Sequence, residues 1–282
     1  MSQAEDILTE AEKYYATDFE KGLFKDLKGQ EKTAFLKNLL NNSHLTSLLA
    51  SQNPTSGAKI LDLGCGLGGF VATCEKNGFD VYGIELDKRA LEITKLRLKN
   101  PQRAIFASGE DLPFENNFFD FVASSLVIEH VKNPELYIKE ALRVVKPGGK
   151  FLLIAPNYLF PWEGHCQMLW APWLLTFSKS LLKAYLKLKN KDTKELEGVN
   201  FKITPGYLKK IIRALDPAEI NDLSVEIFRQ KIRHPEKISY SRFTKVIKTI
   251  QQSKVLSRLL DLSIGFLRLT KLYHPVVLVV QK

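Results

Sequence analysis

The chain has 282 residues, of which 45% are hydrophobic and 26% charged, a composition typical of a globular protein with a sizeable core. Its first residues are acidic and lack a basic start followed by an apolar run, so we expect no signal peptide. The three cysteines, Cys65, Cys74 and Cys166, lack metal-ligand spacing and suit a reducing cytoplasm. The longest uncharged run in the apolar C-terminal part, residues 164–178, is too short for an ordinary membrane span.

The net charge of +10 is unevenly distributed along the chain. Residues 1–160 contain 19 Lys and Arg against 21 Asp and Glu, a net charge of −2. Residues 161–282 contain 22 Lys and Arg against 10 Asp and Glu, a net charge of +12. This asymmetry predicts an anionic partner for the C-terminal part: nucleic acid, an anionic substrate or a membrane surface.

The first part of the chain predicts helices followed by regular alternation of strands and helices. Apolar residues three and four positions apart predict helices within residues 1–50, and residues 51–58 have the composition of a loop. Strands are expected within 58–63, 79–86, 103–108, 117–127 and 149–157, and helices within 68–78, 87–100 and 133–145. Such alternation predicts a doubly wound α/β fold, a mostly parallel sheet with helices on both faces.

The alternation ends after Pro156. Residues 158–173 are expected to form an ordered loop, and 174–191 a basic amphipathic helix with Lys179, Lys183 and Lys187 on one side. A helix begins at Thr204, a strand is expected within 219–232, residues 241–273 are mostly helical and basic, and 274–281 form a final strand. Because no full crossover helix separates the two late strands, we expect them to pair antiparallel at the sheet edge.

The segment ILDLGCGLGGF, residues 60–70, predicts a buried strand, a tight turn and the start of a helix. Glycines at such a turn allow the backbone to approach a ligand closely. Gly64, Gly66 and Gly69 fit the G-x-G-x-x-G pattern of dinucleotide sites. Gly64, Gly66 and Gly68 equally fit G-x-G-x-G, which would favour S-adenosylmethionine. The loop alone therefore leaves both cofactors open.

Two carboxylates lie beside this loop in the predicted sheet. Asp62 precedes the glycines and suits the ammonium group of S-adenosylmethionine, directly or through water; its alternative role is to hold the loop by hydrogen bonds, and we expect the two roles together. Glu85 ends the next strand, about 20 residues after the first glycine, where a carboxylate can accept both ribose hydroxyls. Its alternative role is to bond local backbone. Glu85 suits either cofactor and does not separate them.

An ordered set of motifs resembles the class I S-adenosylmethionine-dependent methyltransferases, in their small-molecule branch. ILDLGCGLGGF looks like the first motif of the family, VYGIELD like the second, and ASGEDLPFENNFFDFV is similar to the third and fourth. IEHVKNPELYIKEALRVVKPGGKFLLIAPN resembles the stretch that runs through the family's fifth strand. The resemblance implies S-adenosyl-L-methionine as cofactor and a Rossmann-like seven-stranded sheet with an antiparallel last strand. A nicotinamide oxidoreductase has no reason to carry this set.

The resemblance also implies the residues that bind the cofactor. They are Asp62, Gly64, Cys65 through its backbone, Gly66, Glu85, Leu86, Gly109, Glu110 and Ser125. The family often has an acidic residue that contacts the adenine amino group where this chain has Ser108, so we expect Gly109 and Glu110 to take over that contact. Quinone-forming members carry a glutamate of a metal cluster where this chain has Leu126, so we expect no metal.

Two histidines are candidates for catalysis. His130 is expected to face the pocket as a general base or substrate contact, with a backbone-bonded residue at a helix start as the alternative. His165 follows the fifth strand, where ligands gather, with a surface loop position as the alternative. Tyr14 and Tyr15 would close the pocket or belong to the core. The chain lacks the family's Asn/Asp-Pro-Pro-Tyr motif and a nucleophilic cysteine after the fourth strand, which argues against nucleic acid as substrate.

Together these features predict four regions: N-terminal helices (1–56), a cofactor-binding core (57–157), a basic cap (158–272) and the last core strand (273–282). The predicted reaction is methyl transfer to a small-molecule or lipid-linked acceptor, anionic in character, in the cytoplasm. The alternative is a non-catalytic S-adenosylmethionine-binding or scaffold protein of the same fold. The basic helices around 173–190 and 241–272 either dock peripherally at an anionic membrane or form a lid whose lysines face water. The oligomeric state stays open.

Overall fold

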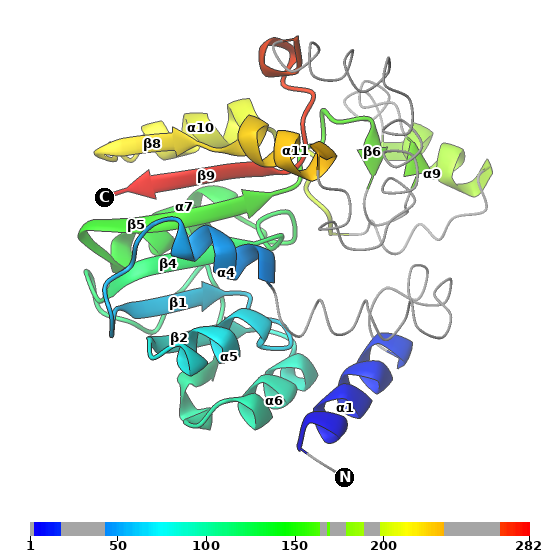
Figure 1. Cartoon of the computed structure of the whole chain (residues 1–282). Coiled ribbons are helices and arrows are strands. Elements are labelled where there is room, and N and C mark those ends of the chain that lie inside the picture. The colour runs from blue at the N-terminus through cyan, green and yellow to red at the C-terminus, as the bar shows by residue number, and fades with distance from the viewer. Residues whose placement is uncertain (1–2, 18–42, 164–167, 170–178, 189–197, 234–265) are drawn as a thin grey trace.

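The computed structural model describes residues 3–17, 43–163, 168–169, 179–188, 198–233 and 266–282. A mixed sheet of seven strands, in the order β3-β2-β1-β4-β5-β9-β8, forms its centre (Figure 1). The strands of the sheet are β1 (Lys59–Leu63), β2 (Asp80–Glu85), β3 (Ala104–Phe106), β4 (Phe119–Ser125), β5 (Val145–Ala155), β8 (Glu219–Asp222) and β9 (Val276–Gln281). The first five are parallel, and β9 pairs antiparallel with both β5 and β8. The predicted fold class and the antiparallel pairing of the two late strands are confirmed.

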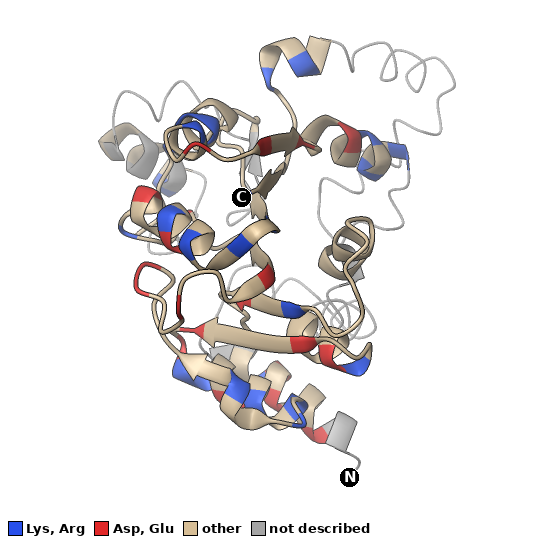
Figure 2. Ribbon diagram, turned by 90° about the vertical axis from the view of Figure 1, so that its left-hand side faces the viewer, with Lys and Arg blue, Asp and Glu red and all other residues tan. Residues whose placement is uncertain are grey.

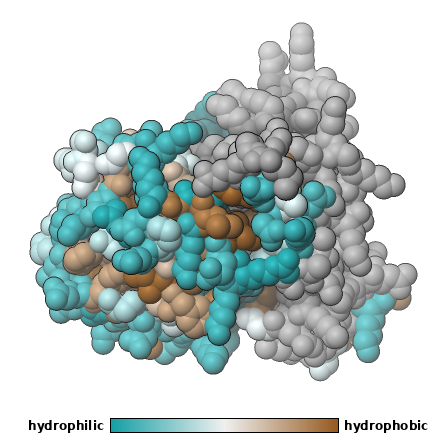
Figure 3. All heavy atoms as spheres, turned by 90° about the horizontal axis from the view of Figure 1, so that it is seen from below, coloured by the Kyte–Doolittle hydropathy of each residue, from teal (hydrophilic) through white to brown (hydrophobic). Residues whose placement is uncertain are grey.

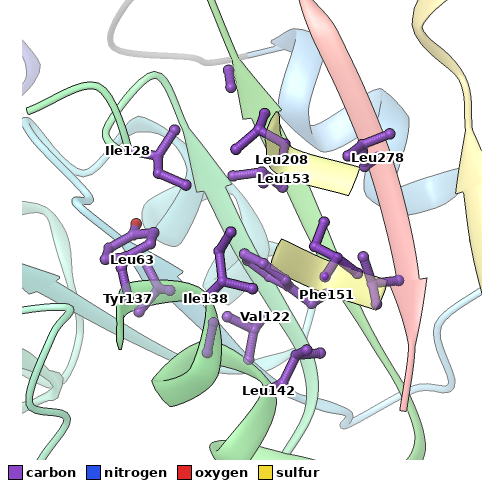
Figure 4. Packing of buried hydrophobic residues seen from close by; sticks show 14 of the residues in the cluster. Leu63, Val122, Ile128, Tyr137, Ile138, Leu142, Phe151, Leu153, Leu208 and Leu278 are labelled. Carbon is purple, nitrogen blue, oxygen red and sulfur yellow. The ribbon is translucent and has the colours of Figure 1, made fainter. Parts of the chain in front are cut away.

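Helices cover both faces of this sheet. They are α4 (Ser43–Ala50), α5 (Gly69–Lys76), α6 (Lys88–Arg97) and α11 (Ser224–Arg233) on one face, and α7 (Pro134–Val144) and α10 (Pro205–Arg213) on the other. The alternation of side chains along a strand supplies both cores, since Ile60 faces the first group and Leu61 and Leu63 face the second. Figure 4 shows this second core, where Leu63, Val122 and Phe151 of the sheet meet Ile138 of α7.

Capping residues set the starts of three helices. The Asp87 side chain accepts hydrogen bonds from the backbone N–H groups of Arg89 and Ala90, at 2.9 and 3.0 Å, and so begins α6. Asn133 and Thr204 cap α7 and α10 in the same way, each followed by a proline in the first turn. The predicted helix starts at 87 and 204 agree with these caps.

The carboxyl ends of the parallel strands all lie on one edge of the sheet, the right-hand edge in Figure 1. Helix α1 (Gln3–Thr17), helix α9 (Lys179–Leu188) and the short hairpin of β6 (Trp162–Glu163) and β7 (Met168–Leu169) lie on that same side (Figure 1). Parallel α/β sheets bind ligands at this edge, so the fold places the glycine loop after β1 in the position of a binding site.

Two segments of the basic C-terminal part differ from expectation. The predicted loop 158–173 contains the β6–β7 hairpin, and the segment 219–232, expected to hold a strand, contains both β8 and most of α11. The helix forms because Ile227, Phe228 and Ile232 recur at helical spacing and are all buried. The expected helices in residues 18–42 and 241–265 fall outside the described residues.

Candidate cofactor site

The glycine loop after β1 has a backbone that only glycine adopts readily. Gly64, Gly66 and Gly68 have φ angles of 77°, 51° and 71°, all in the left-handed region. At Gly64 a Cβ atom would also lie 2.4 Å from Cγ2 of Val127, so no side chain fits there. The backbone N–H groups of Gly64 and Cys65 both donate to the carbonyl oxygen of Ile84, at 3.0 and 2.9 Å, which ties the loop to β2.

Helix α6 holds the same loop from its other side. The Thr94 hydroxyl donates to the carbonyl oxygen of Gly66 at 2.7 Å, and Nη1 of Arg97 donates to that of Leu67 at 2.6 Å. Thr94 is fully buried, so its hydrogen bond is shielded from competing water. Sequence reasoning missed both residues, because 28 positions separate Thr94 from Gly66 and only the fold brings them together.

The carboxylate of Glu85 connects the end of β2 to the glycine loop. Its Oε2 accepts a hydrogen bond from the N–H of Gly66 at 2.9 Å. Its Oε1 accepts from the N–H groups of Leu86 at 2.7 Å and Asp87 at 2.9 Å. The local backbone bonding considered as an alternative role is therefore present. A carboxylate has about four acceptor positions, so capacity for a ligand hydroxyl is left.

Asp62 lies beneath the loop and is 3% exposed. Burial raises the pKa of this carboxyl to about 8, and the negative charge of Glu85 acts in the same direction. A cation placed beside Asp62 would oppose both effects and favour the ionised form. The site therefore carries two acidic side chains: Glu85, at the edge of the sheet, and the buried Asp62, whose charge depends on its neighbours.

Three large apolar side chains stand exposed at the same edge. Leu86 follows β2, Phe106 ends β3 and Leu126 follows β4, and Leu126 has a φ of 57°, which is unusual for a leucine. Glu85 and Phe106 are partners in the register of β2 and β3, so the ends of these two strands lie side by side at this edge. Exposed apolar residues beside polar loops are typical of a ligand site. Sequence reasoning named Leu86 but missed Phe106.

The loop that follows β3 packs closely against α7. A Cβ atom at Gly109 would lie 2.3 Å from Cε2 of Tyr137, a fully buried residue whose hydroxyl is hydrogen-bonded to Oγ of Ser124 at 2.7 Å. Glu110 accepts a hydrogen bond from the N–H of Asn133 at 2.6 Å through its Oε1. The contact anchors the Gly109 loop at the start of α7. Ser125, half-buried, ends β4 at the same edge.

The residues predicted for catalysis are only partly placed by the structure. His130 lies in the turn after β4, exposed, with its Nε2 4.0 Å from Oε1 of the buried Glu129. His165 lies outside the described residues. Tyr14 is buried in α1 and its hydroxyl donates to Oδ2 of Asp87 at 3.1 Å, so it joins α1 to the start of α6. Of Tyr15, the backbone belongs to α1 and its side chain is not described.

Two further observations define the limits of the site. In the described ranges, no three His, Cys, Asp or Glu side chains form a group that could hold a metal ion. A groove of about 400 Å³ opens at the opposite edge of the sheet, lined by residues 52–55, 58, 120–121 and 146–150. Its Lys146 is paired with Asp120 at 2.7 Å, and the groove is remote from the glycine loop.

Comparison with known proteins agrees with this geometry. Residues 61–153 match the family described as "Methyltransferase domain". An "Uncharacterized methyltransferase" of Mycobacterium sp. (strain KMS) is 35% identical over 116 residues, which cover 41% of this chain and 46% of that protein. A "Demethylmenaquinone methyltransferase" of Tropheryma whipplei (strain Twist) is 28% identical over 154 residues, which cover 54% of this chain and 62% of that protein.

Residues 61–153 thus carry a methyltransferase domain, and the predicted resemblance to methyltransferases is confirmed. The chain spans about half the length of the curated relatives it matches. Among solved structures, phosphoethanolamine N-methyltransferase 2 of Haemonchus contortus, in complex with S-adenosyl-L-methionine, is 18% identical, with a TM-score of 0.53 over 96% of this chain and 60% of that one. At this identity the likeness shows the fold alone.

Proposed function

We propose that the chain transfers the methyl group of S-adenosylmethionine to a small-molecule or lipid-linked acceptor. The observation that carries the proposal is the convergence of the glycine loop, Asp62 and Glu85 beside the exposed Leu86 and Phe106. Such an edge offers polar partners to the amino-acid and ribose parts of the cofactor and an apolar surface to its adenine ring. The methyltransferase family of residues 61–153 supports the same conclusion.

Each residue then has a role set by its place in the fold. Asp62 faces the ammonium group, the backbone of Gly64, Cys65 and Gly66 lets the amino-acid part approach, and Glu85 accepts one ribose hydroxyl beside its own three backbone bonds. Around the adenine ring we place Leu86, Phe106, Gly109, Glu110 and Ser125. Phe106 is added to the residues expected from sequence because its ring is exposed at the end of β3.

The main contribution of the protein to the reaction is to align the acceptor with the methyl group. S-adenosylmethionine supplies an electrophilic methyl on sulfur: the acceptor's lone pair forms a bond to that carbon while the carbon–sulfur bond breaks. The protein's share is to hold the acceptor in line at this edge. His130 is exposed on the β4 turn, where it would take a proton from an acceptor that must lose one. Its neighbour Glu129 lies close enough to orient the ring.

Two observations bear on the chemical class of the methyl acceptor. Relatives from Tropheryma whipplei and Clavibacter sepedonicus carry the name demethylmenaquinone methyltransferase, which favours a lipid-linked acceptor. The net charge of +12 in residues 161–282 favours an acceptor with anionic character or an anionic environment. We place the acceptor between the β4 turn and the basic cap, residues 158–272.

Calorimetry with S-adenosylhomocysteine tests the cofactor site. The wild type should bind, and Glu85→Ala should weaken binding at least about tenfold, because it removes charge-assisted hydrogen bonds. Glu92→Ala is a matched control, since Glu92 lies exposed on α6 and its ion pair is with Lys95. Equal affinity of Glu85→Ala and Glu92→Ala would contradict the assignment of Glu85.

Turnover needs a separate experiment. A cell extract with its lipids is incubated with methyl-labelled S-adenosylmethionine and the purified protein, and labelled products are separated by extraction into organic solvent. A labelled product that depends on the protein supports the proposed reaction, and its partition between the phases tells lipid from water-soluble acceptors. Tight cofactor binding with no labelled product would favour the non-catalytic alternative.

A further inference from the structure

Helix α9 turns apolar side chains outward. Leu188 is 79% exposed and Leu181 is 51% exposed, and the intervening Ala184 is exposed as well. These positions are three or four residues apart and so share one face of the helix. The exposed Lys187 lies next to this face. A helix that packed only onto the protein would turn such leucines inward.

A second element has the same character. The short helix 266–270 exposes Phe266 by 61% and Leu269 by 82%, three residues apart on one face. Arg268 and Lys271 beside them are exposed too. The pattern of exposed large apolar side chains flanked by cations therefore occurs twice in the basic C-terminal part.

Both elements lie beyond the same edge of the sheet. In Figure 1, α9 stands on the right, the side where the parallel strands have their carboxyl ends, and the short red helix stands at the top, above the end of the sheet at which β9 begins. Figure 2 shows blue cationic residues on the short helix at the top of the molecule. On the face that Figure 3 shows, the described residues form a mixture of hydrophilic and apolar areas.

We propose that α9 and the helix 266–270 dock the protein on a membrane surface that contains anionic lipids. The exposed Leu188, Phe266 and Leu269 enter the boundary between headgroups and acyl chains, while lysine and arginine side chains reach the lipid phosphates. The contact is peripheral, since no helix in the described part of the chain is long and apolar enough to cross a membrane.

Charge decides between a membrane and a second copy of the chain. Residues 161–282 carry a net charge of +12, so two copies that met through this region would repel each other. An anionic lipid surface instead attracts each nearby lysine or arginine side chain. Burying these apolar side chains in anionic lipid is therefore favoured by charge attraction, whereas burying them between two copies of the chain is opposed by charge repulsion.

Docking would also serve the proposed reaction. The edge that carries the glycine loop lies on the same side as the docking helices (Figure 1), so a lipid-linked acceptor would enter the site from the membrane. This link rests on the proposed function, whereas docking itself rests only on the exposed side chains and the charge.

Vesicle co-sedimentation of the full chain tests the proposal. The wild type should sediment with vesicles of phosphatidylcholine and phosphatidylglycerol, less with phosphatidylcholine alone, and less as salt rises. The double variant Leu188→Glu, Leu269→Glu should lose at least about tenfold in partitioning into vesicles, because two leucine side chains that would enter the lipid are replaced by charges.

The control is the double variant Leu96→Glu, Leu136→Glu. It adds the same charge at leucines of α6 and α7 that are 54% and 39% exposed outside the cap. Wild-type sedimentation of this control supports the assigned surface. Equal recovery of the wild type in the supernatant with and without anionic lipid would overturn docking. Docking would also be overturned if light scattering showed a wild-type dimer and the double variant Leu188→Glu, Leu269→Glu were a monomer. S-adenosylhomocysteine binding, measured on the same samples, reports separately on the proposed function.

Discussion

Asp62 is the residue whose chemistry depends most on what binds beside it. Burial raises its pKa to about 8, so near pH 7 it is largely protonated in the ligand-free protein. The ammonium group of the cofactor would favour the carboxylate and release that proton. We therefore expect affinity for S-adenosylhomocysteine to increase as pH rises from 6 to 8, by up to about tenfold per unit.

Calorimetry in buffers of different ionisation enthalpy measures the released proton directly. In Asp62→Asn the release at pH 7 should disappear, although binding itself is weakened. Because the folded state holds this proton more tightly than the unfolded chain, the same carboxyl lowers stability progressively between its ordinary pKa and about 8. Proton release that persists unchanged in Asp62→Asn would assign it to another group.

Gly109 shows how little space the site leaves for a side chain. We expect Gly109→Ala to weaken S-adenosylhomocysteine binding by about tenfold or more, because its Cβ would meet the ring of the buried Tyr137 at 2.3 Å and push the loop out of place. Gly206→Ala is the control, since its Cβ, in the first turn of α10, would lie at an ordinary contact distance of 3.7 Å from Nζ of Lys271. It should leave binding unchanged. Similar losses of binding affinity in both variants would contradict the explanation that the Cβ introduced by Gly109→Ala collides with Tyr137.

At the scale of elements, α6 acts as the support of the glycine loop. Thr94→Val keeps the shape of the side chain but removes its hydrogen bond to the carbonyl of Gly66. We expect this to lower the free energy of unfolding by about 0.5–1.5 kcal/mol and to weaken cofactor binding, because the part-buried carbonyl of Gly66 loses its donor. Thr73→Val is the control, since the Thr73 hydroxyl donates to a carbonyl within its own helix, α5. Urea unfolding and calorimetry measure both effects, and a change in stability without a change in affinity would leave α6 with no role in the site.

The elements also show what the sequence could and could not predict. Strand and helix order came from alternation, turn residues and caps such as Asp87, which act over a few positions. Helix α11 was missed because residues 219–232 contain a strand followed directly by a helix. The strand pattern at the start of this segment was extended over the residues that form the helix. In the candidate site, Gly64, Gly66 and Glu85 were predictable because their residue types and spacing in the sequence already indicate a ligand loop. Thr94, Phe106 and Tyr137 were not, because their roles arise from contacts between distant segments.

At the scale of the whole molecule, the chain order of the sheet brings the parts of the site together. β1 lies between β2 and β4, so the glycine loop after β1 is flanked by Glu85 on one side and by the β4 turn with His130 on the other. The two late strands complete the sheet at its far edge, and α9 lies on the side of the carboxyl ends (Figure 1). The proposed acceptor would then lie on the same side of the sheet as the proposed cofactor site.

A ligand that touches several of these segments at once should stabilise the fold as a unit. At a concentration of S-adenosylhomocysteine 100 times its Kd, linkage predicts about 2.7 kcal/mol of stabilisation. For a chain of this size, that corresponds to a rise in Tm of about 5 °C, measurable by calorimetry. NADH should leave Tm unchanged, and a variant such as Glu85→Ala, with affinity weakened about tenfold, should lose about half of the shift at the same ligand concentration. A rise in Tm with NADH would instead favour the dinucleotide that Gly64, Gly66 and Gly69 alone allow, because only binding to the folded state can raise Tm.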